Sequence, residues 1–278
     1  PAAMIDSPFV PQSRALFIML DKLRIVLIGT SHPGNIGATA RAMHNMGLAD
    51  LALVAPRCEV QTSESISRAS GADALLVTAS LHESLDDAVA DATLVVGASA
   101  RSRTLPWPMI SPRQLGAALP AELSRREARV ALVFGREDSG LTNTELQRCH
   151  RHVHIPTNAE FSSLNLAAAV QVLSYECRLA WLDAGEAGQA AAPSGEVPFG
   201  EAPCGVEWDN PPASHADLER YFAHLERVLT AIGFHDPERP RQLMARLRRL
   251  YLRARPDSLE VSILRGILTA IEKRTGGR

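Results

Sequence analysis

The sequence has few of the features that mark secreted, membrane or metal-binding proteins. Only four of its 278 residues are cysteines, and they are too scattered to form a Cys-x-x-Cys pair. Neither a zinc site nor a disulfide framework is therefore expected, and a reducing cytoplasm suits the chain. No apolar run is long enough to cross a bilayer, so no membrane partner is expected. The first residues also lack a secretory signal, and residues 1–18 are interpreted as an expression remnant before a natural start at Met19.

The two commonest nucleotide-binding fingerprints are also missing. An apolar strand pattern over residues 25–28 leads into the loop 29–37, which has the sequence GTSHPGNIG. This loop contains no Gly-x-Gly-x-x-Gly motif for a dinucleotide and no Lys-Ser/Thr pair for a P-loop, which argues against a nucleotide-dependent oxidoreductase. A glycine loop after a strand still brings backbone close to a ligand. Arg41, in the helix that follows, is placed to reach that ligand.

Charge is unevenly distributed although the formal net charge is only −2. Residues 183–213 hold six acidic residues and no basic one, and their Gly, Ala and Pro content without periodicity predicts a flexible linker. Residues 214–278 hold 13 Lys or Arg against 8 Asp or Glu, a difference of +5. A basic extension indicates an anionic partner, with nucleic acid the first candidate. The predicted domains are thus 19–182 and 214–278, joined by the linker.

Residues 24–181 alternate short apolar runs with amphipathic ones, which predicts an α/β domain with a mainly parallel sheet covered on both faces. Helix starts are expected at Ser80 with Glu83, at Thr142 with Glu145, and at Ser111 before Pro112. A long apolar helix is expected from about Leu164 to Leu182, buried in the core or against a second subunit. The expected strands are 24–28, 51–54, 74–77, 93–97, 130–134 and 153–155, and three further helices are expected over 216–232, 241–254 and 259–274.

Three more loops share the arrangement of an apolar strand followed by glycine or small polar residues, at 97–99, 135–140 and 155–165. Ligands of open parallel sheets bind at the carboxyl ends of the strands. Each loop alone is explained by turn formation, because Gly and Ser are common turn residues. The three together predict a site that holds a compact ligand through backbone groups.

These loops carry three ordered motifs that resemble the SPOUT superfamily of RNA methyltransferases. The motifs are Asn35-x-Gly37-x-x-x-Arg41, then Val133-Phe134-Gly135-x-Glu137-x-x-Gly140-Leu141, and then Ile155-Pro156 with Ser163-Leu164-Asn165-Leu166-Ala167. The resemblance covers about residues 22–182. With the helical extension included, the chain is similar to bacterial tRNA 2′-O-methyltransferases that modify cytidine or uridine at position 32 of the anticodon loop.

The resemblance implies features that periodicity does not reveal. It implies a trefoil knot in the C-terminal part of the sheet, a homodimer formed through the methyltransferase domain, and S-adenosylmethionine bound within the knot. True knots are nearly absent from proteins, so pattern alone does not propose one. The cofactor is then expected to contact Gly97, Ala98, Ser99, Gly135, Ile155, Ser162, Ser163 and Leu164.

The resemblance also implies roles for individual side chains, with Arg41 as the catalytic arginine. A guanidinium with a pKa above about 12 is a poor base, so positioning a phosphate or stabilising an alkoxide suits Arg41 better. Ser163 is expected to orient the substrate or Arg41, or to cap the long helix. Asn35 and Asn165 are expected to bind the substrate, although Asn35 can also hold its own loop. Glu137 is placed at the substrate too, either orienting Arg41 of the same or the partner subunit or standing as a solvated turn acid.

Three alternating histidines, His150, His152 and His154, suggest a metal site because alternation places them on one face of a strand. No carboxylate flanks them, and the chemistry of the family needs no metal. A polar strand face is therefore the favoured interpretation, and no metal is expected.

The run 239–255 holds seven arginines and no acid. Solvated helix faces normally mix both signs, so contact with tRNA phosphates is the favoured interpretation. Helical spacing predicts a leucine face and an arginine stripe, formed by Leu243, Leu247 and Leu250 and by Arg246, Arg249 and Arg253.

The function predicted from the sequence is S-adenosylmethionine-dependent 2′-O-methylation of cytidine or uridine 32 in tRNA. The nearest alternative is a sister enzyme acting on the tRNA wobble position or on ribosomal RNA, and the helical extension and long linker favour the anticodon-loop enzyme. A catalytically inactive RNA-binding module is a different alternative. The presence of Arg41, Ser163 and Asn165 together speaks against it.

Overall fold

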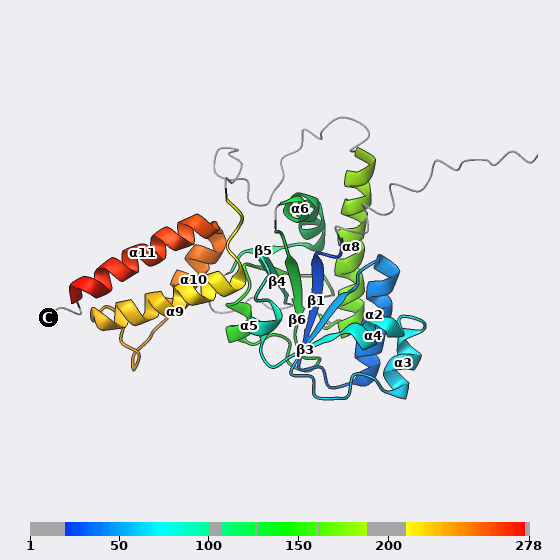
Figure 1. Cartoon of the computed structure of the whole chain (residues 1–278). Coiled ribbons are helices and arrows are strands. Elements are labelled where there is room, and N and C mark those ends of the chain that lie inside the picture. The colour runs from blue at the N-terminus through cyan, green and yellow to red at the C-terminus, as the bar shows by residue number, and fades with distance from the viewer. Residues whose placement is uncertain are drawn as a thin grey trace, which may run out of the picture.

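The computed structural model describes residues 20–99, 107–125, 127–158, 160, 162–187 and 210–275. In this part of the chain, seven strands form one parallel sheet with the order β3-β2-β1-β6-β4-β7-β5 (Figure 1). The parallel pairing confirms the predicted α/β class, while the knot stays a prediction. The strands are β1 (Leu23–Ile28), β2 (Asp50–Val54), β3 (Ser80–His82), β4 (Leu94–Ala98), β5 (Met109–Ile110), β6 (Val130–Phe134) and β7 (Arg151–Val153).

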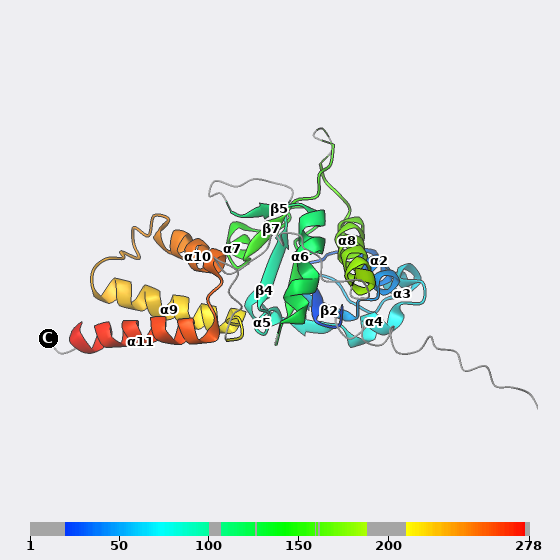
Figure 2. The same ribbon diagram turned by 90° about the horizontal axis from the view of Figure 1, so that it is seen from above.

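Helices cover both faces of this sheet (Figure 2). In β1, alternate side chains enter different clusters: Leu23, Ile25 and Leu27 pack with α2, α6 and α8, and Val26 and Ile28 pack on the side of α5 and α7. This alternation is what a strand buried on both faces requires. The helices of the sheet domain are α2 (Pro33–Met46), α3 (Ser63–Ala69), α4 (Asp73–Thr78), α5 (Leu85–Ala88), α6 (Pro112–Ser124), α7 (Asn143–Leu146) and α8 (Leu166–Ala187).

Strand register brings the candidate loops to one edge of the sheet. Leu27 near the end of β1 pairs with Phe134 at the end of β6, and Gly97 in β4 pairs with Val133. β7 continues the same parallel order beside β4. The loops that follow these four strands therefore begin side by side, as expected for a parallel sheet.

The strand expected at 74–77 is wrong, because these residues belong to the helix α4. Leu75 and Leu76 are buried whereas Val77 is 66% exposed, and this one-sided burial suits a short helix against the core. A four-residue apolar run does not distinguish a strand from a buried helix by periodicity alone. The short strands β3 and β5 were not anticipated from the sequence.

Local capping signals give a mixed outcome. The capping boxes at Ser111 and Thr142 are present, and they start α6 and α7 as predicted. The helix start expected at Ser80 is wrong, because Ser80 begins β3. Ser84 caps α5 instead, and its hydroxyl accepts a hydrogen bond from the backbone N–H of Asp87.

The long helix α8 begins at Leu166, two residues later than expected, and extends to Ala187. Its first turn is capped by Asn165, whose Oδ1 accepts hydrogen bonds from the backbone N–H groups of Ala167 and Ala168. Ser163 is therefore not the N-cap. The helix is buried in the core mainly on one side, because Tyr175 remains 49% exposed in the single chain, and burial of the other side against a second subunit stays a prediction.

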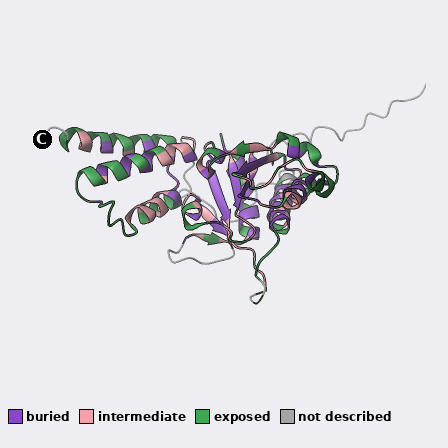
Figure 3. Cartoon of the chain, turned by 90° about the horizontal axis from the view of Figure 1, so that it is seen from below, coloured by how far each residue is buried: buried purple, intermediate pink, exposed green. Residues whose placement is uncertain are grey.

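Residues 210–275 form a helical module of three helices, as the sequence predicted (Figure 1). Their mutual packing gives the module its own apolar core, which includes Tyr221, Phe222 and Leu252. Trp107 of the sheet domain also belongs to this core. The buried strands lie in the interior of the sheet domain, whereas much of the module's outer surface is exposed (Figure 3). The three helices are α9 (His215–Ala231), α10 (Leu243–Ala254) and α11 (Ser258–Thr275).

Candidate active site

A pocket of about 170 Å³ lies where β4, β6 and β7 end and α8 begins. Its wall combines apolar side chains such as Leu141 and Leu166 with loop backbone and serine hydroxyls. Phe134, Val153 and Thr157 also line it, and the sequence did not assign them to the cofactor, although each lies at a strand end or in a candidate loop. Seven of the eight residues expected at the cofactor line the pocket, namely Ala98, Ser99, Gly135, Ile155, Ser162, Ser163 and Leu164.

Gly97, the eighth, is buried beneath the pocket and is not among its lining residues. A Cβ atom here would lie 2.9 Å from Cys149 Sγ and 3.1 Å from Leu141 Cδ1, so glycine allows close packing behind the wall. Gly135 is more constrained, because a Cβ atom would lie 2.1 Å from the carbonyl carbon of Gly140. The loop after β6 can therefore close on itself only without a side chain at Gly135.

A chain of hydrogen bonds connects this loop with the two other candidate loops. Asn35 Nδ2 donates to Glu137 Oε1 (3.1 Å), and Asn165 Nδ2 donates to Asn35 Oδ1 (3.0 Å). The backbone N–H of Ser31 also donates to the Glu137 carboxylate (3.3 Å). Three motifs far apart in the sequence thus meet through side-chain amides and one carboxylate.

Glu137 is consequently held inside the site and is not a solvated turn acid. Burial acts to raise the pKa of Glu137, but the hydrogen bonds from Asn35, from its own backbone and from Ser31, with the electrostatic effect of His32, together outweigh burial and leave the pKa below its usual value. The carboxylate is thus charged at neutral pH and faces the loop that precedes α2. Among the residues that the structure describes, its hydrogen-bond partners include Asn35 and Ser31 and do not include Arg41.

Arg41 lies on α2, and its side chain is exposed. No hydrogen bond or ion pair joins it to any other residue that the structure describes, so its guanidinium is available to an added partner. Ser163 is exposed in the pocket wall. The two predicted catalytic residues therefore come from different elements, and Asn35 and Asn165 provide the link between those elements.

The sequence did not identify Arg136 as a structural residue of this site. Its guanidinium donates to both carboxylate oxygens of Glu145 (3.1 and 3.0 Å), and its backbone pairs with Gly140. Glu145 is held in turn by the capping box with Thr142, because its carboxylate accepts a hydrogen bond from the backbone N–H of Thr142 (2.7 Å). The capping box predicted at Thr142 and Glu145 is therefore the sequence signal that indicates a fixed Glu145 carboxylate beside the loop 135–140.

Backbone groups bind the three alternating histidines. His150 Nδ1 accepts a hydrogen bond from the backbone N–H of Val95 (3.0 Å), and His152 Nε2 lies 2.9 Å from the carbonyl oxygen of Leu146. Burial lowers the pKa of both side chains, and that of His150 lies well below its usual value. His154 Nδ1 lies 3.3 Å from the carbonyl oxygen of Ser99. The histidines thus have separate backbone partners, and two are buried, unlike a polar strand face in solvent.

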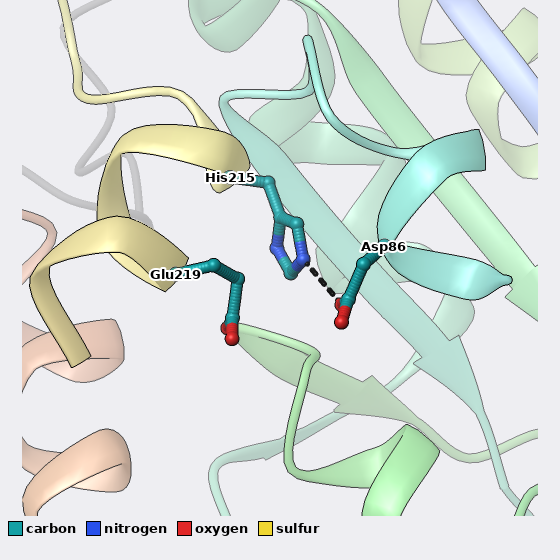
Figure 4. A group of neighbouring side chains, drawn as sticks. All are labelled: Asp86, His215 and Glu219. Carbon is teal, nitrogen blue, oxygen red and sulfur yellow. Dashed lines mark hydrogen bonds and ion pairs between the residues drawn. The ribbon is translucent and has the colours of Figure 1, made fainter. Parts of the chain in front are cut away.

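Another cluster contains side chains of the kinds that bind metals, namely Asp86, His215 and Glu219 (Figure 4). Their potential ligand atoms lie within 4.8 Å of one another. Both carboxylates are already paired with the guanidinium of Arg148, at 3.0 Å for Asp86 and 3.2 Å for Glu219. Arg248 also binds Glu219. The positive charge at this group is thus supplied by arginine side chains.

The basic run forms α10 and its flanks, and its arginines are of two kinds. Arg246 and Arg253 are exposed and Arg249 is half-buried, whereas Arg248 and Arg255 pair with acids from other helices. The lack of acids within the run therefore does not mean that all its arginines are unpaired. The expected leucine face is also partly wrong, because the module's core is contacted by Met244, Leu247, Tyr251 and Leu252 whereas Leu250 is 46% exposed.

Comparisons with known proteins assign both parts of the chain. Residues 22–175 match the SpoU rRNA Methylase family, and residues 216–278 match the C-terminal domain of the tRNA methyltransferase TrmJ. The chain is 50% identical to the tRNA (cytidine/uridine-2′-O-)-methyltransferase TrmJ of Klebsiella pneumoniae subsp. pneumoniae, over 94% of this chain and all of that protein. It is also 50% identical to the tRNA (cytidine/uridine/adenosine-2′-O-)-methyltransferase TrmJ of Pseudomonas aeruginosa, over 93% of this chain and 97% of that protein.

Solved structures agree with these relatives. The TrmJ structure from Z. mobilis ZM4 is 32% identical, covers 90% of this chain and 98% of its own, and superposes with a TM-score of 0.73. A probable methyltransferase from Bordetella pertussis is 38% identical with a TM-score of 0.56, and matches 59% of this chain but 99% of its own. No helix in the described ranges combines the length and apolar character needed to span a membrane.

The two family matches and the half-identical relatives together decide the family. The chain belongs to the SpoU rRNA Methylase family, and its helical module is the C-terminal domain of the TrmJ tRNA methyltransferases.

Proposed function

We propose that this enzyme transfers a methyl group from S-adenosylmethionine to the ribose 2′-hydroxyl of cytidine or uridine at position 32 of the tRNA anticodon loop. The relatives with about half of their residues identical carry names that specify tRNA and 2′-O-methylation. The observation that carries the proposal is the hydrogen-bonded chain Glu137–Asn35–Asn165, which joins the pocket to the helix of Arg41.

The residues of the pocket fit this cofactor. Gly135 leaves the loop backbone free to face a ligand, and a side chain at this position would collide with the loop. Ile155 and Leu164 offer apolar contacts for an adenine ring, and Ser99 and Ser162 offer hydroxyls for polar groups. S-adenosylmethionine, when bound, supplies a methyl group activated by its sulfonium charge.

The work of the protein is then to bring a ribose hydroxyl into line and keep it there. Arg41 can pair with an RNA phosphate or with the developing alkoxide, because it is exposed and has no partner among the described residues. Ser163 lies in the pocket wall, where its hydroxyl can orient the ribose. Asn35 and Asn165 hold the two elements in register while the substrate binds.

We further propose a cytoplasmic homodimer formed through the sheet domain. The described cysteines, Cys58, Cys149 and Cys177, are all unpaired, which suits a reducing compartment. Val172 and Tyr175 expose apolar surface on α8, at 36% and 49%, and so offer contact area to a second copy.

Transcripts of tRNA with cytidine or uridine at position 32 test the reaction. Incubation with labelled S-adenosylmethionine, digestion and nucleoside mapping should place the methyl group at position 32 and nowhere else. Methylation at the wobble position, or of ribosomal RNA only, would support the sister-enzyme alternative. Transcripts with adenosine 32 address the wider base range that the Pseudomonas relative's name specifies.

Arg41→Ala tests the assigned catalytic role. We expect the rate of methyl transfer to fall at least about 100-fold, the size of effect seen when a charge-stabilising donor is removed. Cofactor affinity, measured by calorimetry, should stay unchanged because Arg41 does not line the pocket. Arg68→Ala is the matched control, since Arg68 is exposed on the neighbouring helix α3. Normal methylation by the Arg41 variant would contradict the assignment.

The exposed arginines of α10 are assigned to tRNA phosphates. Arg246→Ala and Arg253→Ala should each weaken tRNA binding. Each should also make the negative slope of the logarithm of the binding constant against the logarithm of salt concentration shallower, by about 0.7 to 0.9 per lost contact. Unchanged salt dependence in the double variant would exclude these side chains from the tRNA interface.

A further inference from the structure

The helical module is docked directly on the sheet domain (Figure 2). At the start of α9, the backbone N–H of His215 donates to the carbonyl oxygen of Ala92 (2.8 Å), and that of Ala216 donates to Ala90 (3.0 Å). Trp107 inserts its ring into the module's core and donates its Nε1–H to the carbonyl oxygen of Cys149 (2.8 Å). Backbone pairing and an aromatic anchor thus join the two parts.

Arg255 makes the most deeply buried charged contact of this interface. It is 7% exposed, and it pairs with Glu122 of α6, which is 2% exposed. Its second amino group donates to the carbonyl oxygen of Thr93 (3.3 Å). The Arg255 guanidinium is therefore directed into the sheet domain and cannot itself contact an RNA phosphate.

The backbone conformation at Arg255 favours glycine, so the ion pair with Glu122 explains why an arginine occupies this position. Arg255 has φ = +53°, in the left-handed region, and ends α10 before the turn into α11. Glycine adopts this conformation without strain, whereas other residues pay an energetic penalty. The arginine is thus strained by its backbone and stabilised by its buried ion pair.

A second set of contacts fixes the module at another point (Figure 4). His215 Nε2 lies 2.9 Å from Asp86 Oδ1, and Arg148 of the sheet domain binds both Asp86 and Glu219. Arg248 of α10 binds the same Glu219 and lies over the Phe222 ring of α9. Two separate charged contacts and one aromatic anchor thus join the module to the sheet domain.

We propose that the Arg255–Glu122 pair is a positioning element for the RNA substrate, which holds the module so that its exposed arginines stand at a fixed distance from the pocket. The inference rests on the proposed function, because it takes tRNA as the ligand of both parts. Phosphate contacts add affinity wherever the module lies. They align the target ribose with the pocket only if the module keeps a fixed position relative to the pocket. Loosening the pair should therefore lower kcat and not only raise KM.

Arg255→Gly tests this positioning role in the full-length enzyme. Glycine removes the ion pair and relieves the backbone strain, so a loss is attributable to the side chain. We expect hydrogen exchange at the backbone N–H groups of residues 215 and 216 to accelerate about tenfold, since these groups bond across the interface. We also expect kcat on tRNA to fall about tenfold, with cofactor affinity unchanged.

Three further variants sharpen the interpretation. Arg241→Gly is matched for charge and backbone, because Arg241 also has a left-handed φ of +47° but is exposed; it should leave the exchange at residues 215–216 unchanged. Glu122→Gln removes the charge with the smallest change of shape and should repeat the Arg255 effects more weakly. The exchanged pair Glu122→Arg with Arg255→Glu restores an ion pair but places a second guanidinium beside Arg125, which pairs with Glu122 in the wild type (3.6 Å), so it should recover only part of the exchange protection and kcat.

Normal exchange and normal kcat in a folded Arg255→Gly enzyme would overturn the proposal. A loss of kcat without faster exchange would overturn it too, because the residue would then act by another route. If the wild type neither binds nor methylates tRNA, the proposed function fails, whereas the exchange data still report docking.

Discussion

Replacing Gly135 by alanine tests whether backbone closeness builds the pocket. In the structure, the added Cβ would lie 2.1 Å from the carbonyl carbon of Gly140 and 2.3 Å from the nitrogen of Leu141. Ordinary contacts of a Cβ atom begin at 3.4 Å, so the loop must move by more than 1 Å. The atoms that must move are backbone, which cannot turn away as a flexible side chain does.

That displacement breaks the closure of the loop. The backbone N–H of Arg136 donates to the Gly140 carbonyl (3.2 Å), and that of Gly140 donates to the Arg136 carbonyl (2.9 Å). Losing both bonds costs about 2 kcal/mol, and overpacking adds about 1 kcal/mol or more. We therefore expect the free energy of unfolding to fall by about 3 kcal/mol in urea titrations. S-adenosylmethionine affinity should fall at least about tenfold by calorimetry, because this loop forms one wall of the pocket.

Gly140→Ala is the control on the same loop. Its Cβ would meet nothing within 4 Å, but its φ of +69° strains any other residue. We expect a loss of about 1 to 2 kcal/mol in stability from this strain, without the steric displacement of the loop that Gly135→Ala requires. If Gly135→Ala unfolds at the same urea concentration as the wild type and binds the cofactor normally, the steric reasoning is refuted.

Two other side chains give independent tests. Asn35→Ala removes the link between Glu137 and Asn165, and should lower the methyl transfer rate at least about tenfold while changing the free energy of unfolding by only about 1 kcal/mol; an unchanged rate would show that the link is structural only. His150 is buried with a pKa well below its usual value, because of burial first and then of the electrostatic effects of Arg255, His215 and Arg151. The unfolded chain therefore binds a proton near pH 6.5 that the folded chain does not, so stability falls as pH decreases through that value. Between pH 7.5 and 5.5 one such histidine lowers the free energy of unfolding by about 1.4 kcal/mol. This loss should be absent from urea titrations of the His150→Asn variant, and an undiminished loss in that variant would contradict the assignment.

Signals that act over a few residues could be read from the sequence, and those that act between distant segments could not. The caps at Ser111 and Thr142 were predictable because donor and acceptor lie three residues apart. The apolar run 74–77 was misread because strand and helix fit so short a pattern equally well, and burial against the core decided for the helix. Glu137 was recognised as a site residue, but its bond to Asn35 depends on how β1 and β6 pair.

The sequence by itself determined the parallel α/β class, the helical extension, the glycine loops and the family to which the motifs point, because periodicity and motif spacing are properties of the chain alone. Tertiary structure decided which charges remain free. Arg255 and Arg246 look alike in an acid-free run, yet one is buried against Glu122 and the other is exposed. An ion pair between residues 133 positions apart is set by packing and not by local order. Only the folded chain therefore separates the arginines available for tRNA from those that hold the molecule together.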